Sequence, residues 1–275
     1  MSSFGARLRA AMDARGPFCP GIDPHGALLV SWGLPDTLDG LRTFALTAAE
    51  ALAPVSASVK PQSAFFERFG SAGVAVLEET IRTIREAGAL AILDVKRGDI
   101  GSTAQGYADA YLDPASPLAV DAITASPYLG FGSLAPMLET AAKHEAGVIV
   151  LALTSNPEGP QFQHARTADG RTVAGTVLDA LREANAGATP LGSYGAVVGA
   201  TIGETGEDLG INGPLLVPGI GAQGGSPETV RRIFGDVLAN VVPNSAREIL
   251  GAGPDPAALR AAVQQANDSF STLLR

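Results

Sequence analysis

Cysteine, basic residues and long apolar runs are scarce in this sequence, and each scarcity excludes a class of protein. Cys19 is the only cysteine in 275 residues, which excludes an intrachain disulfide framework and a multi-cysteine metal site and is typical of a reducing cytosol. Acidic residues (28) outnumber Lys and Arg (19), so the net charge is −9 and we expect no nucleic-acid partner, although an anionic small molecule fits. The sequence has no run of about 18 apolar residues and no signal-peptide core, so we expect a cytoplasmic protein without membrane contact.

Apolar residues, in contrast, are abundant. Hydrophobic residues make up 46% of the chain and charged residues 17%, so the chain can bury a large core. Short β-branched runs alternate with longer helical patterns, and this alternation predicts a parallel sheet. The predicted strands are residues 17–24, 55–62, 90–97, 122–128, 147–154, 196–201, 215–221 and 237–244. The predicted helices are residues 41–52, 72–87, 101–112, 133–144, 170–186, 204–210, 227–234 and 256–274.

Eight strand–helix units in a chain of this length predict an α/β fold, a (β/α)8 TIM barrel that forms a single catalytic domain over residues 1–275. An open, doubly wound sheet is the competing arrangement. Catalytic residues of such barrels lie at the carboxyl ends of the strands. Charged and polar residues gather at those predicted ends in this chain, whereas the strand starts are bland.

The third predicted strand, within "ILDVKRGD", ends in a cluster of charges. Asp94 and Lys96 share the face that points into the barrel mouth, whereas Leu93 and Val95 pack outward against helices, because successive side chains of a strand alternate. The same alternation turns Lys60, at the end of the second strand, into the mouth. Two lysines and a carboxylate are therefore expected to converge.

This convergence has a structural and a catalytic interpretation. A buried ion pair adds little net stability, because desolvation offsets the Coulomb attraction. A lysine that neighbouring carboxylates keep charged is instead a ready proton donor, and an ionised carboxylate can repel an anionic group that must leave. We favour the catalytic interpretation, and we expect Arg97, on the opposite face, to be structural or solvated.

A glycine-rich stretch, "PGIGAQGG" at residues 218–225, follows the seventh strand. Ser226 and Pro227 come next and are typical of a helix N-cap and first turn. Glycines let backbone N–H groups approach an anion, and barrel loops after strands seven and eight often bind phosphate. Arg247, after the eighth strand, would add a bidentate contact. We therefore expect a phosphate site here, with an ordinary glycine-rich turn as the alternative.

Other kinds of site have little support in the sequence. His25, His144 and His164 are scattered without metal-ligand spacing, so we expect no metal. No GxSxG elbow or Cys/His pair indicates a covalent nucleophile.

Several motifs together resemble the orotidine 5′-phosphate decarboxylase family, most closely its longer bacterial (type 2) branch. The most specific is Asp-x-Lys-x-x-Asp-Ile at residues 94–100, and the resemblance extends over about residues 17–250. The motifs, in family order, are "GIDPH", "SVKPQSAFFE", "DVKRGDIGSTAQGYA", "SPYLGFGSL", "LTSNPEG" and "PGIGAQGG". The resemblance implies cofactor-free decarboxylation of orotidine 5′-monophosphate (OMP) to uridine 5′-monophosphate (UMP), the last step of de novo pyrimidine synthesis.

The resemblance also implies roles for individual residues. The catalytic array would comprise Lys60, Asp94, Lys96 and Asp99. Lys96 would protonate C6 as carbon dioxide leaves, and Asp94 would press against the substrate carboxylate. Asp99, Ile100 and Thr103 would reach the neighbouring site of a homodimer. The remaining contacts would be Asp23 and Lys60 to the ribose, Ser155 to the pyrimidine, and Pro218, Gln223, Gly224 and Arg247 around the phosphate.

Two departures and two alternatives accompany the resemblance. Gly132 stands where the family has aspartate, and Ala246 stands where we expect serine or glycine. Magnesium-dependent sugar-phosphate decarboxylases or aldolases of the same superfamily share the Asp-x-Lys-x-x-Asp motif, but they need a further carboxylate near strand two, where this chain has Lys60. A non-catalytic sensor of phosphorylated ligands would not need the charged array. We expect a lid at residues 221–227, with help from a longer loop at residues 157–171.

Overall fold

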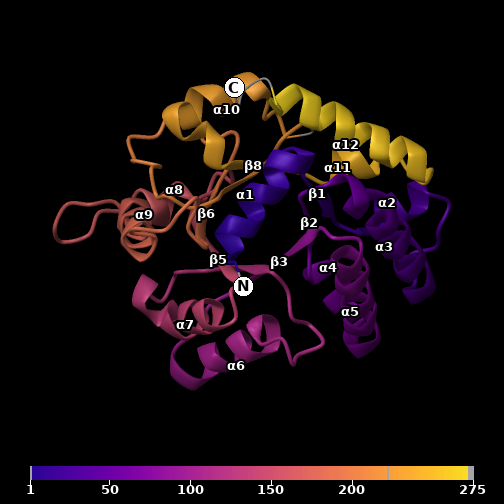
Figure 1. The fold of residues 1–275 in the computed structure, drawn as a ribbon, viewed down its shortest axis with the longest axis horizontal. Helices are drawn as coiled ribbons and strands as arrows, with labels where there is room; N and C mark the ends of the chain where they lie inside the picture. The colour runs from indigo at the N-terminus through magenta and orange to yellow at the C-terminus, as the bar shows by residue number, and fades with distance from the viewer. Residues whose placement is uncertain (1, 222, 272–275) are drawn as a thin grey trace.

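The computed structural model describes residues 2–221 and 223–271. Eight parallel strands close into a barrel in sequence order, with β1 beside β8, and most of the larger helices form a ring around it (Figure 1). This closure confirms the predicted (β/α)8 barrel and excludes the open sheet. The strands are β1 (Cys19–Ile22), β2 (Ser58–Pro61), β3 (Leu90–Arg97), β4 (Ala122–Ala125), β5 (Gly147–Leu153), β6 (Tyr194–Val198), β7 (Leu215–Pro218) and β8 (Val241–Ser245).

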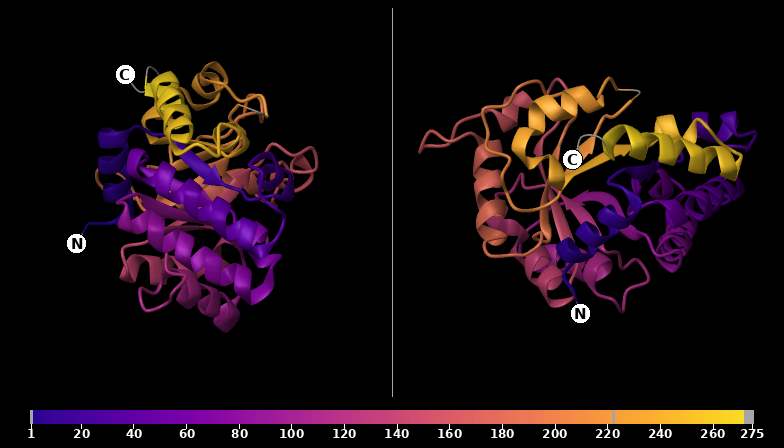
Figure 2. Two further views of the ribbon diagram at one scale, coloured as in Figure 1. Left: turned by 90° about the vertical axis from the view of Figure 1, so that its right-hand side faces the viewer. Right: turned by 45° about the horizontal axis from the view of Figure 1, so that its top comes forward.

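Longer and shorter helices divide the remaining chain between them. The longer helices are α1 (Phe4–Arg15), α3 (Leu38–Leu52), α5 (Gly70–Glu86), α6 (Gly101–Leu112), α7 (Ala135–Lys143), α9 (Val173–Ala184), α10 (Pro227–Phe234) and α12 (Pro256–Ser271). The shorter ones are α2 (Gly26–Ser31), α4 (Ala64–Glu67), α8 (Pro160–Gln163) and α11 (Arg247–Leu250), with 3-10 turns η1 (Ala53–Val55), η2 (Phe131–Leu134) and η3 (Gly235–Asn240). The predicted long loop after β5 contains α8 and then projects away from the barrel (Figure 2). Among the described residues, none of the helices is both long and apolar enough to cross a membrane.

Two predicted elements are wrong. Residues 204–210 form an irregular loop instead of a helix; there the Asp208 carboxylate accepts the Gly210 N–H at 2.8 Å, a local bond that competes with helix formation. Residues 237–240 belong to η3 and not to the eighth strand, which begins at Val241. The other predicted strands and helices are found with ends that are shared or shifted by a few residues. Residues 272–274 of the predicted last helix lie outside the described residues.

The inside of the barrel has its own apolar core, which α1 closes at the amino ends of the strands. Phe4, Leu8 and Met12 of α1 pack against residues that point inward from the strands, such as Ile92 of β3. The fit leaves no spare room: a Cβ on Gly147 would lie 2.3 Å from the Phe4 ring. Figure 1 shows α1 across the centre of the ring. The sequence analysis missed this helix, which leaves the opposite, carboxyl end as the open mouth.

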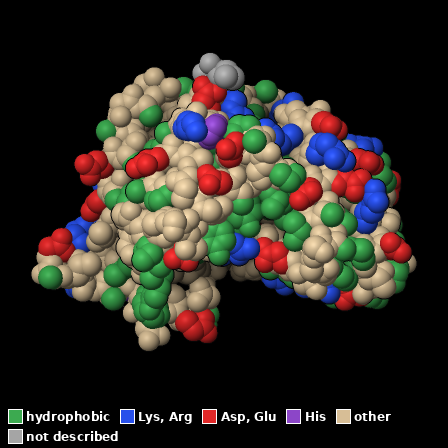
Figure 3. Space-filling model, turned by 90° about the horizontal axis from the view of Figure 1, so that it is seen from below, with side chains coloured by type: hydrophobic (Ala, Val, Ile, Leu, Met, Phe, Trp, Pro, Cys, Tyr) green, Lys and Arg blue, Asp and Glu red, His purple; other side chains and the backbone are tan. Residues whose placement is uncertain are grey.

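Some hydrophobic side chains are exposed on the side of the molecule that carries α6 and α7. Figure 3 looks at the molecule from this side and shows hydrophobic side chains gathered across the middle of the face. Ile100, just before α6, has 61% of its surface exposed.

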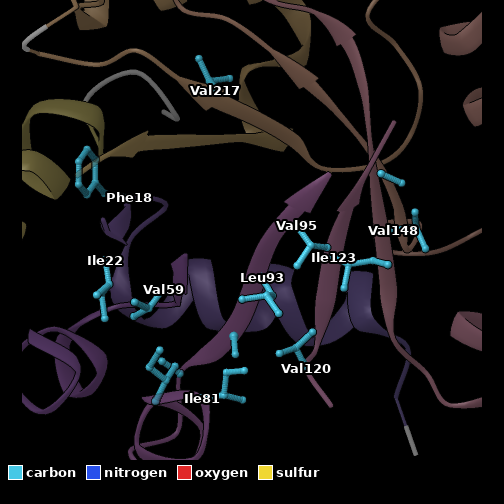
Figure 4. Packing of buried hydrophobic residues seen from close by; sticks show 14 of the residues in the cluster. Phe18, Ile22, Val59, Ile81, Leu93, Val95, Val120, Ile123, Val148 and Val217 are labelled. Carbon is cyan, nitrogen blue, oxygen red and sulfur yellow. The ribbon is translucent and has the colours of Figure 1, made fainter. Parts of the chain in front are cut away.

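The second core lies between the barrel and the helices. Leu93 and Val95 of β3 belong to it, close to Ile123 of β4 (Figure 4). Their neighbours on the strand, Ile92 and Asp94, face the barrel interior and mouth. The predicted alternation along β3 is thus confirmed, and it delivers the charged residues to the mouth.

Candidate active site

A cavity of about 490 Å³ opens at the carboxyl ends of β1, β2, β3, β7 and β8. Its position is the one expected for a barrel enzyme. The sequence-predicted residues that line it are Asp23, Lys60, Asp94, Pro218, Gln223 and Arg247. The structure therefore gathers residues from both ends of the chain around one opening.

Asp94 is the centre of the charged cluster. Its Oδ2 accepts hydrogen bonds from Lys60 Nζ at 3.0 Å and from Gln62 Nε2 at 2.8 Å. Its Oδ1 accepts from Lys96 Nζ at 2.6 Å and from the Thr124 hydroxyl at 2.7 Å. The predicted convergence of Asp94 with both lysines is confirmed.

Electrostatics keeps the buried pair ionised. Burial alone would raise the pKa of the Asp94 carboxyl, but the Lys60 and Lys96 ammonium groups outweigh it and hold that pKa well below its usual range. Burial alone would lower the pKa of Lys60, but the carboxylates of Asp94 and Asp23 outweigh it and raise the pKa above its ordinary value. The Lys60–Asp94 pair therefore stays ionised at neutral pH.

Lys96 combines a charged partner with access to solvent. Its side chain is 44% exposed, whereas that of Asp94 is 9% exposed. Its backbone adopts φ of +47°, in the left-handed region, where the pairing of β3 with β4 shifts register between Leu93 and Arg97. A non-glycine residue in this region costs about 1–2 kcal/mol, and such strain is typical of functional sites.

Asp23 lines the cavity and, within the described part of the chain, has one side-chain acceptor without a donor. Its Oδ1 lies 4.0 Å from Lys60 Nζ and, among the described residues, has no hydrogen-bond donor although it is buried. A buried carboxylate oxygen of this kind is stabilised by a donor from a ligand. A sugar hydroxyl supplies such a donor.

The glycine-rich loop after β7 is folded onto itself. Gly219, Gly221 and Gly224 have φ of +98°, +71° and +90°, which other residues adopt only with strain. The N–H groups of Gly221 and Gly224 donate to loop carbonyls at 2.9 and 2.7 Å, so in this conformation they are not offered to an anion. The loop must rearrange to use them. Position 222 lies outside the described residues.

The helix after this loop begins as predicted. The Ser226 hydroxyl accepts the Thr229 N–H at 3.3 Å, the Thr229 hydroxyl accepts the Ser226 N–H at 2.8 Å, and Pro227 occupies the first turn of α10. Nearby, Arg247 opens α11 and lines the cavity; its guanidinium forms no ion pair with any described residue. A free cation therefore faces the side of the cavity near the glycine loop.

Six predicted residues do not line this cavity in the single chain. Two of them are Lys96, which is bonded to Asp94, and Gly224 of the glycine-rich loop. Ser155 lines a neighbouring cavity of about 550 Å³ between the loops after β5 and β6. Asp99, Ile100 and Thr103 lie at the start of α6, and the Asp99 carboxylate accepts the N–H of Ile100 at 2.8 Å instead of a bond from Lys96. Ile100 and Thr103 are exposed, and Asp99 is half-buried.

Arg97 and the two departures from the family pattern lie outside the charged cluster. Arg97 pairs with Glu67 at 2.6 Å and lies 5.6 Å from the Tyr107 ring centre, which confirms a structural arginine. Ala246 packs against Gly21, and a Cβ built on Gly132 would meet no described atom within 4 Å.

Sequence reasoning missed Gln62 and Thr124, the two uncharged donors to Asp94. Both follow the alternation that was used for the lysines: Gln62 is two residues beyond Lys60, and Thr124 is two residues beyond the inward-facing Ala122. Applying the alternation to polar as well as charged residues would have found them. Among the described residues, no three His, Cys, Asp or Glu side chains form a group that could hold a metal ion.

Comparisons with known proteins agree with this geometry. The sequence model of the Orotidine 5'-phosphate decarboxylase / HUMPS family matches residues 17–262. An orotidine 5'-phosphate decarboxylase from Salinispora arenicola is 64% identical over 266 residues, covering 96% of each chain. One from a Nocardioides species is 63% identical over 273 residues, covering 98% of this chain and 99% of its own.

Solved structures give the same result. A provisionally named orotidine 5'-phosphate decarboxylase from Streptomyces avermitilis is 56% identical with a TM-score of 0.98, covering 100% of this chain and 96% of its own. The OMP decarboxylase of Leishmania donovani is 29% identical with a TM-score of 0.75, covering 99% of both chains. The chain therefore belongs to the Orotidine 5'-phosphate decarboxylase / HUMPS family.

Proposed function

We propose that this protein decarboxylates OMP to UMP, the last step of de novo pyrimidine synthesis, without a cofactor. The observation that carries the proposal is the ionised Asp94 bonded between Lys60 and Lys96 at the open mouth of the barrel. The relatives described above bear the name of this activity at up to 64% identity over nearly the whole chain.

In the proposed reaction, the bond between C6 and the carboxylate carbon breaks and its electron pair stays on C6. Asp94 lies against the substrate carboxylate, and the ammonium group of Lys96 faces C6. Fixed positive charge stabilises the developing carbanion more than the substrate, which is the requirement for catalysis. A proton from Lys96 Nζ then forms the new C6–H bond, carbon dioxide departs, and Lys96 regains its proton from solvent.

The remote parts of the substrate supply binding energy. The position of Asp23 and Lys60 in the cavity lining supports hydrogen bonds to the ribose hydroxyls. Gln223 and Arg247, with Pro218 and Gly224 of the loop, would hold the phosphate once the loop rearranges, and Ser155 would bind the pyrimidine from its neighbouring cavity. Binding energy from groups far from C6 can then lower the barrier at C6.

We further propose a homodimer in which each site is completed by its neighbour. The exposure of Ile100, beside the start of α6, supports this arrangement. Asp99, Ile100 and Thr103 would leave their own subunit and enter the partner's site. Asp99 would thereby become the second carboxylate beside Lys96.

We place the reaction in the cytoplasm. The single, buried thiol of Cys19 has no need of an oxidising compartment. To test this placement, cells that carry the native gene are fractionated and each fraction is immunoblotted for this protein. We expect the protein in the cytoplasmic fraction and not in the membrane fraction.

The competing function is that of the magnesium-dependent sugar-phosphate enzymes in the same superfamily. Purified protein, stripped with EDTA, should consume OMP in an ultraviolet assay at an unchanged rate, because the array contains a lysine at the second strand end. The same protein should not convert ketogulonate or hexulose phosphates, with or without added magnesium. Loss of OMP turnover in EDTA, or turnover of the sugar phosphates, would favour the alternative.

Tight nucleotide binding in calorimetry with no UMP formed would instead indicate a sensor.

A further inference from the structure

One uncharged side chain contacts both partners of the pair to which we assign the chemistry. Thr124 of β4 is fully buried. Its hydroxyl donates to Asp94 Oδ1 at 2.7 Å and accepts the backbone N–H of Lys96 at 3.0 Å. Because Lys96 Nζ donates to the same Oδ1 at 2.6 Å, the three residues close a ring of hydrogen bonds.

The ring lies where the regular strand pairing fails. Leu93 pairs with Ile123 and Arg97 pairs with Ala125, so β3 has two extra residues between these points. Lys96 lies within this bulge with φ of +47°. The Thr124 hydroxyl accepts the backbone N–H of Lys96 within this bulge, and this bond helps to hold the left-handed turn in place.

We propose that Thr124 is a positioning residue for proton delivery: its hydroxyl fixes the backbone of Lys96 and the carboxylate of Asp94 in one geometry. The inference rests on the proposed function, in which Lys96 protonates C6. A hydroxyl suits this task because it donates and accepts at once. Neither the family motif nor the cavity lining includes Thr124, since it acts from beneath Asp94.

Comparing four side chains at position 124 separates the effect of the hydroxyl on activity from that of the methyl group. Threonine has both groups, and Thr124→Ser keeps only the hydroxyl. Thr124→Val keeps the methyl group and puts a second one in place of the hydroxyl, and Thr124→Ala has neither. Thr80→Val is the matched control, because Thr80 is also fully buried and its hydroxyl donates to Val76 O at 2.7 Å within α5.

The kinetic readout is the split between kcat and KM for OMP. Thr124→Val and Thr124→Ala should lose kcat by about 100-fold, because misplacing a reacting group by about 1 Å costs that much. Their KM should change little, since the ribose and phosphate contacts remain. Thr124→Ser and Thr80→Val should retain kcat close to wild type. The proposal would be overturned if Thr124→Ser and Thr124→Ala lost kcat equally while Thr124→Val kept a kcat near wild type. That result would show that the reaction depends on the methyl group and not on the hydroxyl.

A second readout does not depend on activity. The chain has three lysines, Lys60, Lys96 and Lys143, so selective ¹⁵Nζ-lysine labelling gives signals that single substitutions can assign. The Lys96 signal should move in Thr124→Val and stay in Thr124→Ser, while the Lys143 signal stays in both. An unchanged Lys96 signal in Thr124→Val would refute the positioning role even if the protein decarboxylates OMP. If the wild-type protein did not act on OMP, the proposed function would be refuted. The Lys96 signal would still show whether the Thr124 hydroxyl positions Lys96.

Discussion

At the residue scale, both oxygens of Asp94 are fully used. A carboxylate offers about four acceptor sites, and Asp94 fills them with two lysines, an amide and a hydroxyl. The alternation along β2 and β3 predicted the lysines because charges in a buried strand are conspicuous. The same alternation also turns Gln62 and Thr124 inward, toward Asp94. Neither was predicted, because an amide or a hydroxyl at a strand end is too common to indicate a site. The turn of Lys96 into the left-handed region leaves no mark on the sequence at all.

The buried pair also determines how stability depends on pH. The pKa of Lys60 is raised above its ordinary 10.5, so the folded protein holds this proton where the unfolded chain releases it. Stability from the pair is therefore fully present below pH 10.5 and is lost as the pH rises further. We expect the free energy of unfolding, measured with urea at pH 9, 10 and 11, to fall more steeply with pH in wild type than in Lys60→Met.

Cys19 needs to be separated from this effect. Burial raises the pKa of its thiol from 9.0 to about 11, so the thiol adds its own decline above pH 9 in both proteins. The quantity to compare at each pH is therefore the difference in free energy of unfolding between wild type and Lys60→Met. A difference that stays constant from pH 9 to 11 would mean that Lys60 is not stabilised by its carboxylates.

At the element scale, α1 is the part that the sequence analysis overlooked. Its buried residues recur at intervals of four, but arginines stand between them and the segment reads as a charged N-terminus. The barrel strands were easier to predict, because their apolar runs alternate with helices in a regular order. The glycine loop shows the opposite case: its residues were identified, whereas its self-bonded conformation depends on tertiary contacts that composition does not encode.

Phe4 tests the role of α1 as the floor of the barrel. Phe4→Ala should lower the free energy of unfolding by about 3–5 kcal/mol, because it leaves a void under the interior core. Phe162→Ala is the control: that ring is 53% exposed in α8, and its loss should cost less than about 1 kcal/mol. Urea denaturation measures both, and equal small losses would show that α1 does not seal the barrel.

At the scale of the whole molecule, the proposed homodimer builds each active site from two chains. The single chain keeps Asp99 bonded to its own backbone, away from Lys96. Mixing Lys96→Ala chains with Asp99→Ala chains should restore activity, because one site of each mixed dimer then has both residues. Each variant alone should be nearly inactive in the OMP assay. Verified mixed dimers with no recovered activity would instead assign Asp99 to its own chain's site.

The most direct measurement concerns Lys96 itself. Lys96→Ala should abolish OMP decarboxylation in the ultraviolet assay while the far-ultraviolet circular dichroism of the barrel is unchanged, because no other described ammonium group is both bonded to Asp94 and partly exposed. Lys143→Ala, the same change at the exposed end of α7, should keep wild-type turnover. Near-normal turnover by Lys96→Ala would contradict the account at its centre.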